Sequence, residues 1–561
     1  MDNPTSSQAE DLTKSGAEVS FTRLPAVRVG PKELSDAQAS TVFLVGLALI
    51  CAVTTLIGAV PTRMFGHDTF IPLEMGWRVL HGQRPHVDFV SGWGPVWFLL
   101  SALGLVISRH SVDGIGYANA IMGMLVGSWS FLLSKGRLLP LWRVVLSLFL
   151  VALVVAPYPL GNSPLMSSHA MVYNRYGYAL LGLVLVECLE PARDSEARVP
   201  HPSFFCLGGF CGGISTGAAL SLALFLKVSF FLVGAGIVAV LALVTMSFGP
   251  RRVLGMAAGF GAVSLALLAY LRFDLLAMLR DLRMAGAARS AAFTTEGIAN
   301  KLVSRPSALL LVVLFAWVSA LLLPRWRGWR LPLVGALMFA ADLAIIMTNQ
   351  QWDGFVLCAC FGILIANELM REQQQEPAAK RPLYAGALCL AALLFVPQFA
   401  GDLFGLGYGL WSKEGARSEV DIVRLTPPNL APLVLYDGHI PRSNGRVLAN
   451  YVNDGVALLE RDSRPDETIL SLDMTNPFPY ALERRPARGG VASPTYHFNL
   501  DDEHRPSDDE FFGDADIVMV PKHPALDDFF YKDFLRAYEP GIHQRYTLAA
   551  ESAWWWMYRR K

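Results

Sequence analysis

The sequence predicts a polytopic α-helical membrane protein that carries a small α/β domain at its C-terminal end. Two observations support this prediction. Of the 561 residues, 53% are hydrophobic and only 17% are charged, whereas soluble domains carry roughly 25% charged residues. The apolar residues are also concentrated in blocks of about 20 residues, the length that an α-helix needs to cross a bilayer. We therefore expect most of the chain to lie in lipid.

Eleven apolar blocks are predicted to span the membrane. They are residues 41–60, 115–134, 141–158, 172–189, 204–224, 228–247, 253–271, 307–323, 331–348, 354–370 and 383–400. A further apolar stretch, 95–108, has only about 14 residues, a length that favours an interfacial or re-entrant segment. When this stretch is held at the outer surface, five loops rich in Lys and Arg all fall on the cytoplasmic side, as the positive-inside rule requires.

These positions divide the chain into three parts. Residues 1–38 are predicted to form a disordered cytoplasmic tail, 39–400 a transmembrane domain with its first outer loop at 61–114, and 401–561 an outer domain. An odd number of spans places the two ends of the chain on opposite faces. The layout suits a bacterial inner membrane, with the N-terminus cytoplasmic and the C-terminal domain periplasmic.

Composition also narrows the partners. All seven cysteines lie within or at the ends of apolar blocks, which argues against a disulfide framework or a cysteine metal site. The net charge is zero, so we expect no nucleic-acid partner. Membrane lipids are the partners that the apolar spans imply.

The C-terminal segment is predicted to be a small α/β domain because apolar spacing there alternates between helix and strand periods. Helices are expected at 447–459 and 525–538, and strands at 468–472, 517–520, 546–549 and 554–558. An interfacial helix is expected in the third outer loop, 272–306. No internal repeat is visible among the spans, which disfavours an inverted-repeat transporter.

The first outer loop is the most chemically unusual segment, because it holds carboxylates and cationic groups in close alternation. The carboxylates are Asp68, Glu74 and Asp88, and the cationic or titratable groups are His67, Arg78, Arg84 and His86. Such a loop at a membrane surface can supply a general base beside cations that hold an anionic leaving group. The alternative is an ordinary solvated loop whose charges pair with one another.

The same loop resembles the GT-C superfamily of membrane glycosyltransferases, which use polyprenyl-phosphate sugars. The resemblance rests on Asp68 soon after the first span, an amphipathic segment, the residues Gly82, Pro85, Asp88 and Phe89, and Gly94-Pro95 opening an apolar helix. Protein O-mannosyltransferases and the aminoarabinose and galacturonic acid transferases of lipid A belong to this superfamily. It implies a GT-C-like fold with juxtamembrane helices in the first loop, and an inverting transfer of a sugar to an outer-face glycan, lipid or protein.

The resemblance also implies roles for the three carboxylates. Asp68 occupies the position of the general base that acts on the acceptor hydroxyl. Members often carry Asp-Glu there, whereas this chain has Asp68-Thr69, so Glu74 is a candidate for the second carboxylate. Asp88 is either a further catalytic carboxylate or a cap of the next segment. The lipid-linked sugar is the implied donor; a divalent metal is possible but unsupported, because the second outer loop contains no Asp or Glu.

Four candidate substrate-binding residues lie outside the first loop: Arg175, Lys227, Asp342 and Tyr496. Arg175 either contacts a phosphate or snorkels to the interface. Lys227 follows a Gly-rich helix, and the resemblance implies that it grips the lipid phosphate, with snorkelling as the alternative. Asp342 lines a cavity or proton path, or pairs with a neighbouring helix. Tyr496 stacks on sugar or packs in a core.

Two other functions compete with sugar transfer. The first is a transporter or flippase of a lipid-linked or small anionic substrate, in which Lys227 and Asp342 would be substrate groups. The second is a non-catalytic sensor or scaffold built around the C-terminal domain. Lack of repeats weighs against the first, and the charge-dense first loop weighs against the second.

Overall fold

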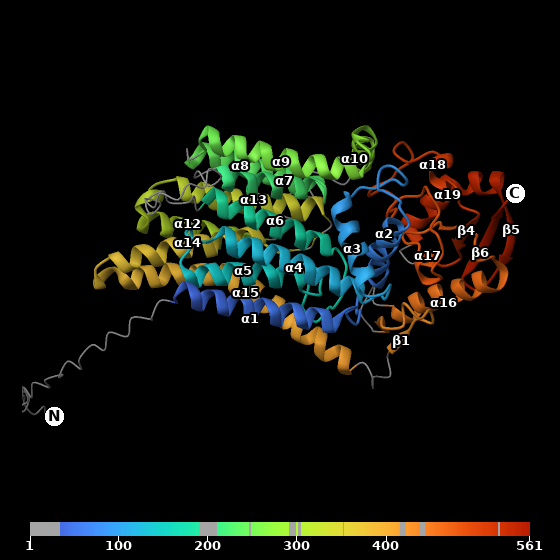
Figure 1. Ribbon diagram of the computed structural model, residues 1–561, viewed down its shortest axis with the longest axis horizontal. Coiled ribbons are helices and arrows are strands. Elements are labelled where there is room, and N and C mark those ends of the chain that lie inside the picture. Colours follow the sequence, from blue (N-terminus) through green and yellow to red (C-terminus); the bar gives the residue numbers. More distant parts are fainter. Residues whose placement is uncertain are drawn as a thin grey trace, which may run out of the picture.

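The chain forms a long bundle of helices with a mixed α/β domain at one end (Figure 1). The computed structural model describes residues 34–189, 210–245, 248–290, 299–300, 305–349, 351, 353–415, 422–437, 444–524 and 528–561. The bundle helices are α1 (Asp36–Ile57), α4 (Gly114–Leu133), α5 (Pro140–Val155), α6 (Val172–Leu189), α7 (Phe210–Leu224), α8 (Val228–Thr245), α9 (Pro250–Tyr270), α12 (Pro306–Leu322), α13 (Arg330–Thr348), α14 (Val356–Gln375) and α15 (Arg381–Gly415). Each predicted span coincides with one of these helices.

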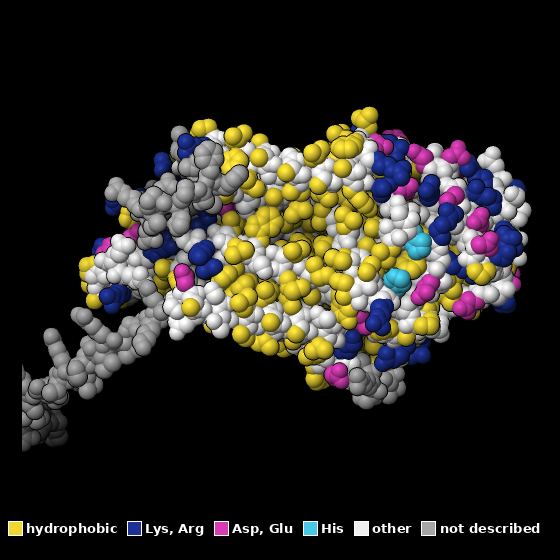
Figure 2. All heavy atoms as spheres, in the orientation of Figure 1, with side chains coloured by type: hydrophobic (Ala, Val, Ile, Leu, Met, Phe, Trp, Pro, Cys, Tyr) yellow, Lys and Arg dark blue, Asp and Glu magenta, His cyan; other side chains and the backbone are white. Residues whose placement is uncertain are grey.

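The bundle has the surface of a multi-pass membrane protein. Six helices are long and apolar enough to cross a bilayer, namely α1, α4, α8, α9, α13 and α15, and α3, α5, α7 and α12 are shorter apolar helices. Figure 2 shows a broad band of hydrophobic side chains over the bundle, with charged side chains gathered at its two ends. The predicted fold class is confirmed. The start of the predicted span 204–224, most of the predicted 1–38 tail and the basic loop at 193–198 lie outside the described residues.

Two helices mark the end of the bundle that is next to the C-terminal domain. The apolar stretch at 95–108 forms α3 (Pro95–Ile107), which has 13 residues and begins with proline at its first turn, where a missing N–H is tolerated. The last bundle helix, α15, has 35 residues and ends at Gly415, beyond the end near residue 400 that hydropathy predicts. One face of this extension stays buried through Leu406 and Gly409, which explains why the helix continues.

The C-terminal domain is a four-stranded sheet covered by a helix on each face. Its strands are β3 (Ile469–Ser471), β4 (Ile517–Pro521), β5 (Tyr546–Glu551) and β6 (Trp555–Arg560), in the order β3-β4-β6-β5, and only β3 and β4 are parallel. Ile517 and Met519 pack with α16 (Gly445–Asp462), and Val518 and Val520 pack with α19 (Asp528–Arg545). This alternation is the strand period that the sequence predicts.

All four predicted strands and both predicted helices of this domain are present, although 525–527 lie outside the described residues. The remaining elements outside the bundle were not predicted individually, except for the interfacial helix of the third outer loop, which is α10. They are η1 (Gly66–Thr69), α2 (Phe70–Leu80), α10 (Leu275–Ser290), η3 (Pro324–Trp326), η4 (Ala378–Lys380), β1 (Ile422–Arg424), β2 (Val434–Tyr436), α17 (Phe478–Ala481) and α18 (Asp508–Phe512).

The helix α2 of the first loop lies between the bundle and the C-terminal domain (Figure 1). Phe70, Leu73 and Trp77 on one side of α2 belong to the core that contains α16 and one face of the sheet. Ile71 and Met75 on the other side belong to the core of the bundle. Because α2 contributes side chains to both cores, it completes the C-terminal domain and fixes that domain to the bundle.

Candidate functional site

Asp68 lies in η1, directly before α2. The Asp68 Oδ1 atom lies 3.3 Å from His67 Nε2, and each side chain is 12% exposed. Burial raises the pKa of Asp68 above its ordinary value, while the charge of His67 acts to lower it. A carboxylate whose pKa is raised in this way suits a general base.

Glu74 and Arg78 face the C-terminal domain instead. Arg78 Nε donates to Glu74 Oε1 at 3.2 Å, and the backbone N–H of Asn476 donates to Glu74 Oε2 at 3.1 Å. Arg78 Nη1 also donates to the carbonyl oxygens of Ala487 and Gly489. Burial raises the pKa of Glu74, and Arg78 opposes that rise. This buried pair joins α2 to the C-terminal domain, so Glu74 does not stand beside Asp68 as a second carboxylate.

Thr69 occupies the position where the resemblance would place that second carboxylate. Its side chain is fully buried, and its hydroxyl has no hydrogen-bond partner in the described part of the chain. An unsatisfied buried hydroxyl is costly and calls for an explanation. The sequence pattern gave no reason to single out Thr69.

Asp88 closes the turn that precedes it in the first loop, rather than capping the segment that follows. Its Oδ2 atom accepts the backbone N–H of Arg84 at 2.8 Å, and its Oδ1 atom lies 3.7 Å from Arg488 Nε of the C-terminal domain. The Arg84 guanidinium lies 5.8 Å from the centre of the Tyr270 ring at the end of α9. Both residues therefore stabilise the turn that leads to α3.

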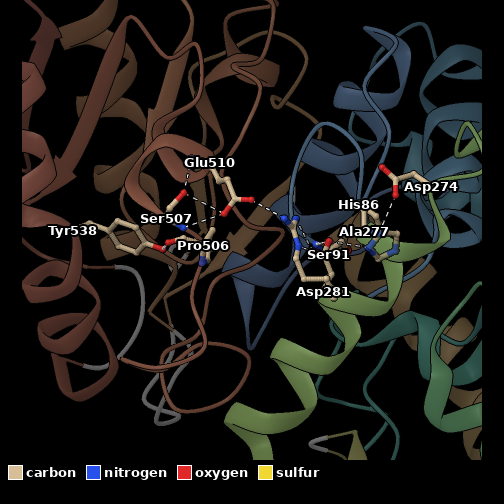
Figure 3. Close-up of polar contacts among 10 residues, drawn as sticks. His86, Ser91, Asp274, Ala277, Asp281, Pro506, Ser507, Glu510 and Tyr538 are labelled. Carbon is tan, nitrogen blue, oxygen red and sulfur yellow. Dashed lines mark hydrogen bonds and ion pairs between the residues drawn. The ribbon is translucent and has the colours of Figure 1, made fainter.

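His86 pairs with a residue of the third outer loop (Figure 3). Its Nδ1 atom lies 2.9 Å from Asp281 Oδ2 on α10, both side chains have no exposed surface, and the same carboxylate accepts the N–H of Ser91 at 3.1 Å. The adjacent Arg280 donates to Glu510 of α18 at 2.6 Å. Helix α10 thus ties the first loop to the C-terminal domain. The sequence predicted an interfacial helix here but gave no role to Asp281.

Lys227 lies in the turn between α7 and α8, against aromatic rings of the first loop and of the start of α6. Its Nζ atom is 4.7 Å from the centre of the Tyr173 ring and 5.9 Å from that of Trp93. Trp97 packs on Tyr173 as well, at 4.9 Å between ring centres. Trp97 and Tyr173 belong to the same core as Ile71 and Met75. The lysine therefore lies against the core of the bundle.

Gly94 explains how this turn fits against α3. A Cβ atom at Gly94 would lie 2.1 Å from the carbonyl oxygen of Phe225, so only glycine fits. The N–H groups of Gly94 and Val96 donate to the carbonyl oxygens of Leu226 and Phe225. The Gly-Pro pair that was read as a family motif therefore docks the start of α3 on the turn that carries Lys227.

Arg175 and Asp342 have their polar atoms engaged inside the bundle. Arg175 is 1% exposed, and its guanidinium donates to Asp402 Oδ1 at 2.9 Å and to the carbonyl oxygens of Leu153 and Tyr158. Asp342 accepts the N–H groups of Leu357 and Cys358, each at 3.0 Å. It therefore caps the start of α14, where carboxylates are favoured. We do not retain either residue in the candidate site.

Tyr496 and His169 also have structural roles. Tyr496 is 1% exposed in the core of the C-terminal domain, and its hydroxyl donates to Asp502 at 2.7 Å. His169 of the second outer loop accepts the N–H of Val60 through Nε2 at 3.0 Å. Burial lowers the pKa of His169 to about 4, so this imidazole is neutral near pH 7. Tyr496 has no ring surface for a sugar, and His169 joins the first two outer loops.

Among the described residues, no group of three or more His, Cys, Asp or Glu side chains is arranged to hold a metal ion. The candidate residues form two groups, Asp68 with His67 and Thr69, and Lys227 with Trp93, Trp97 and Tyr173.

Solved structures with a similar layout include two membrane proteins. One is ArnT from Cupriavidus metallidurans bound to undecaprenyl phosphate, with a TM-score of 0.38, 12% identity, and coverage of 92% of this chain and 97% of that chain. Another is the Archaeoglobus fulgidus oligosaccharyltransferase tethered with an acceptor peptide, with a TM-score of 0.37, 14% identity, and coverage of 81% and 64%. No family model and no curated protein matches the sequence. Likenesses this distant describe a general layout and do not transfer residue roles.

Proposed function

We propose that this protein is a membrane glycosyltransferase that moves a sugar from a polyprenyl-phosphate donor to an acceptor at the outer face. One observation carries the proposal: the three candidate carboxylates of the first loop have different surroundings. Glu74 is bonded to the C-terminal domain and Asp88 closes a turn. Asp68 is held only beside His67 among its described side-chain contacts and is largely buried.

The reaction we propose needs one base and one anion-binding group. Asp68 accepts the proton of the acceptor hydroxyl, whose oxygen attacks the anomeric carbon of the sugar. The bond between that carbon and the phosphate oxygen breaks on the opposite face, so the configuration inverts. Polyprenyl phosphate leaves with the bonding electron pair, and Lys227 stabilises its charge.

The remaining assignments follow from the charge pattern of the loops. We propose that the N-terminus is cytoplasmic, that residues 39–400 form the transmembrane domain, and that the domain from residue 401 lies in the periplasm of a bacterial inner membrane. The acceptor is then a periplasmic glycan, lipid or protein. The helix α15 crosses this boundary and ends at Gly415.

A transporter is less well supported by the same contacts. Of the two charges that suggested it, Lys227 and Asp342, the second is bonded to the N–H groups of Leu357 and Cys358 at the start of α14. A substrate would have to displace these partners.

The proposal is tested with purified protein in lipid nanodiscs, labelled polyprenyl-phosphate sugars and membrane extract as the acceptor source. Asp68→Asn should retain donor binding and lose about 10²- to 10⁴-fold in transfer rate, the usual contribution of a general base. Asp88→Asn is the matched control, because asparagine can still cap the turn; it should retain most activity. Equal transfer by wild type and Asp68→Asn would remove Asp68 as the base.

A further inference from the structure

The outer end of α15 exposes a stripe of aromatic side chains. Phe404, Tyr408 and Trp411 follow the four- and three-residue spacing of one helix face. Phe404 and Trp411 are 56% and 62% exposed. The Phe404 and Tyr408 rings are stacked at 6.3 Å, and the Tyr408 and Trp411 rings are 5.6 Å apart. The stripe is therefore an ordered surface that no described part of the chain covers.

Packing against α1 gives the depth of this stripe in the membrane. A Cβ atom at Gly409 would lie 3.3 Å from Ile57, the last residue of the membrane-spanning helix α1. At 1.5 Å per residue, Phe404 lies about 7.5 Å below that level and Trp411 about 3 Å above it. The stripe thus crosses the boundary between acyl chains and head groups, where tyrosine and tryptophan are enriched.

A cation without a recorded counter-ion lies at the same level. The Arg63 guanidinium is 5.7 Å from the centre of the Tyr408 ring and 3.8 Å from that of Tyr436. Arg63 Nε is buried and has no hydrogen-bond partner among the described residues. No carboxylate of the described residues forms an ion pair with Arg63. Nearby Lys413 differs, because its Nζ atom lies 3.2 Å from Asp113.

We propose that Arg63 and the outer end of α15 form a binding site for an anionic membrane lipid. The acyl chain lies along Phe404 and Trp411, and the phosphate of the head group pairs with Arg63. The aromatic stripe favours a lipid over a free anion, because a free phosphate has no use for the exposed rings. The site does not depend on the proposed sugar transfer, and its test involves no donor or acceptor.

Native mass spectrometry of the purified full-length protein tests the site. The protein is titrated with phosphatidylglycerol and, separately, with phosphatidylcholine of the same acyl chains. We expect phosphatidylglycerol to be preferred roughly five-fold at one site, since one arginine near an anionic head group contributes about 1 kcal/mol. Arg63→Gln should abolish the preference, and Arg63→Lys should retain it. Arg424→Gln, which removes an exposed arginine on β1, is the matched control and should also retain the preference.

A photo-crosslinking residue gives an independent measurement if Arg63→Gln does not fold. Benzoylphenylalanine at position 411 should label phosphatidylglycerol, whereas the same residue at the buried position 406 should not. Equal binding of the two lipids by wild type, or an unchanged preference in a folded Arg63→Gln variant, would overturn the proposal. Displacement of the lipid by millimolar inorganic phosphate would also overturn it, because the site would then recognise a free anion.

Discussion

Charged residues in α2 and in the turn just before it have different surroundings. Within α2, Glu74 and Arg78 are bonded to each other and to the C-terminal domain. In η1, directly before α2, Asp68 has His67 as its side-chain partner. A charge-dense loop can therefore contain a structural connection and a candidate reaction centre within ten residues. The two roles differ only in whether a residue of a neighbouring element pairs with the charged side chain.

The largest effect is expected from breaking the connection to the C-terminal domain. Arg78→Met leaves Glu74 buried without its counter-ion, and removal of one partner of a buried pair costs about 3–5 kcal/mol. The free energy of unfolding in detergent should fall by that order, and protease should cut the first loop faster. Glu74→Gln combined with Arg78→Met should recover part of the loss. If Arg78→Met is as stable as wild type, the pair of Glu74 and Arg78 does not stabilise the contact between α2 and the C-terminal domain.

The next largest effect is expected at Lys227, the proposed anion-binding group. Lys227→Met should weaken binding of the polyprenyl-phosphate donor by roughly 10- to 100-fold, because a hydrogen bond to a charged group contributes about 1.5–3 kcal/mol. Thermal stability should change little. Binding is measured with labelled donor in nanodiscs, and Lys227→Arg, which retains the charge, is the control. Unchanged donor affinity would leave Lys227 as a snorkelling residue.

A smaller effect is expected in the pH dependence of transfer. Asp68 acts as a base only when it is deprotonated, so the rate falls as pH falls through its pKa. Burial raises this pKa and protonated His67 lowers it, so His67→Gln should raise the pKa further. The acid limb of kcat/KM should then move by about one unit to higher pH, with the plateau rate retained. A shift to lower pH would contradict the assignment of Asp68.

Local features of the fold were predictable from the sequence because they depend on short-range patterns. Span positions follow from length and lack of charge, and the strands β4 and β6 follow from short runs of apolar and aromatic residues. The role of α2 in the C-terminal core was not predictable. Trp77 donates to a carbonyl oxygen 407 residues away, and no local pattern encodes that distance.

The same limit applies to the candidate site. The sequence made Asp68 a candidate through the family resemblance of the first loop, and Lys227 a candidate because a charge at membrane depth is unusual. It could not separate them from Arg175 and His86, whose partners Asp402 and Asp281 lie 227 and 195 residues away. Partner identity decides whether a charge is structural, and it depends on tertiary contacts. Arg63 was missed because only its tyrosine neighbours from α15 and β2 make it distinctive.

The smallest effect is expected at the exposed ion pair between Arg280 of α10 and Glu510 of α18 in the C-terminal domain. These side chains are 53% and 45% exposed, and exposed ion pairs contribute about 0.2–1 kcal/mol. Glu510→Gln isolates the charge, because glutamine still completes the capping box that starts at Ser507. The melting temperature should fall slightly at low salt and match wild type at high salt. A large loss that persists in salt would mean that this contact, rather than the buried pair of His86 with Asp281, holds α10 in place.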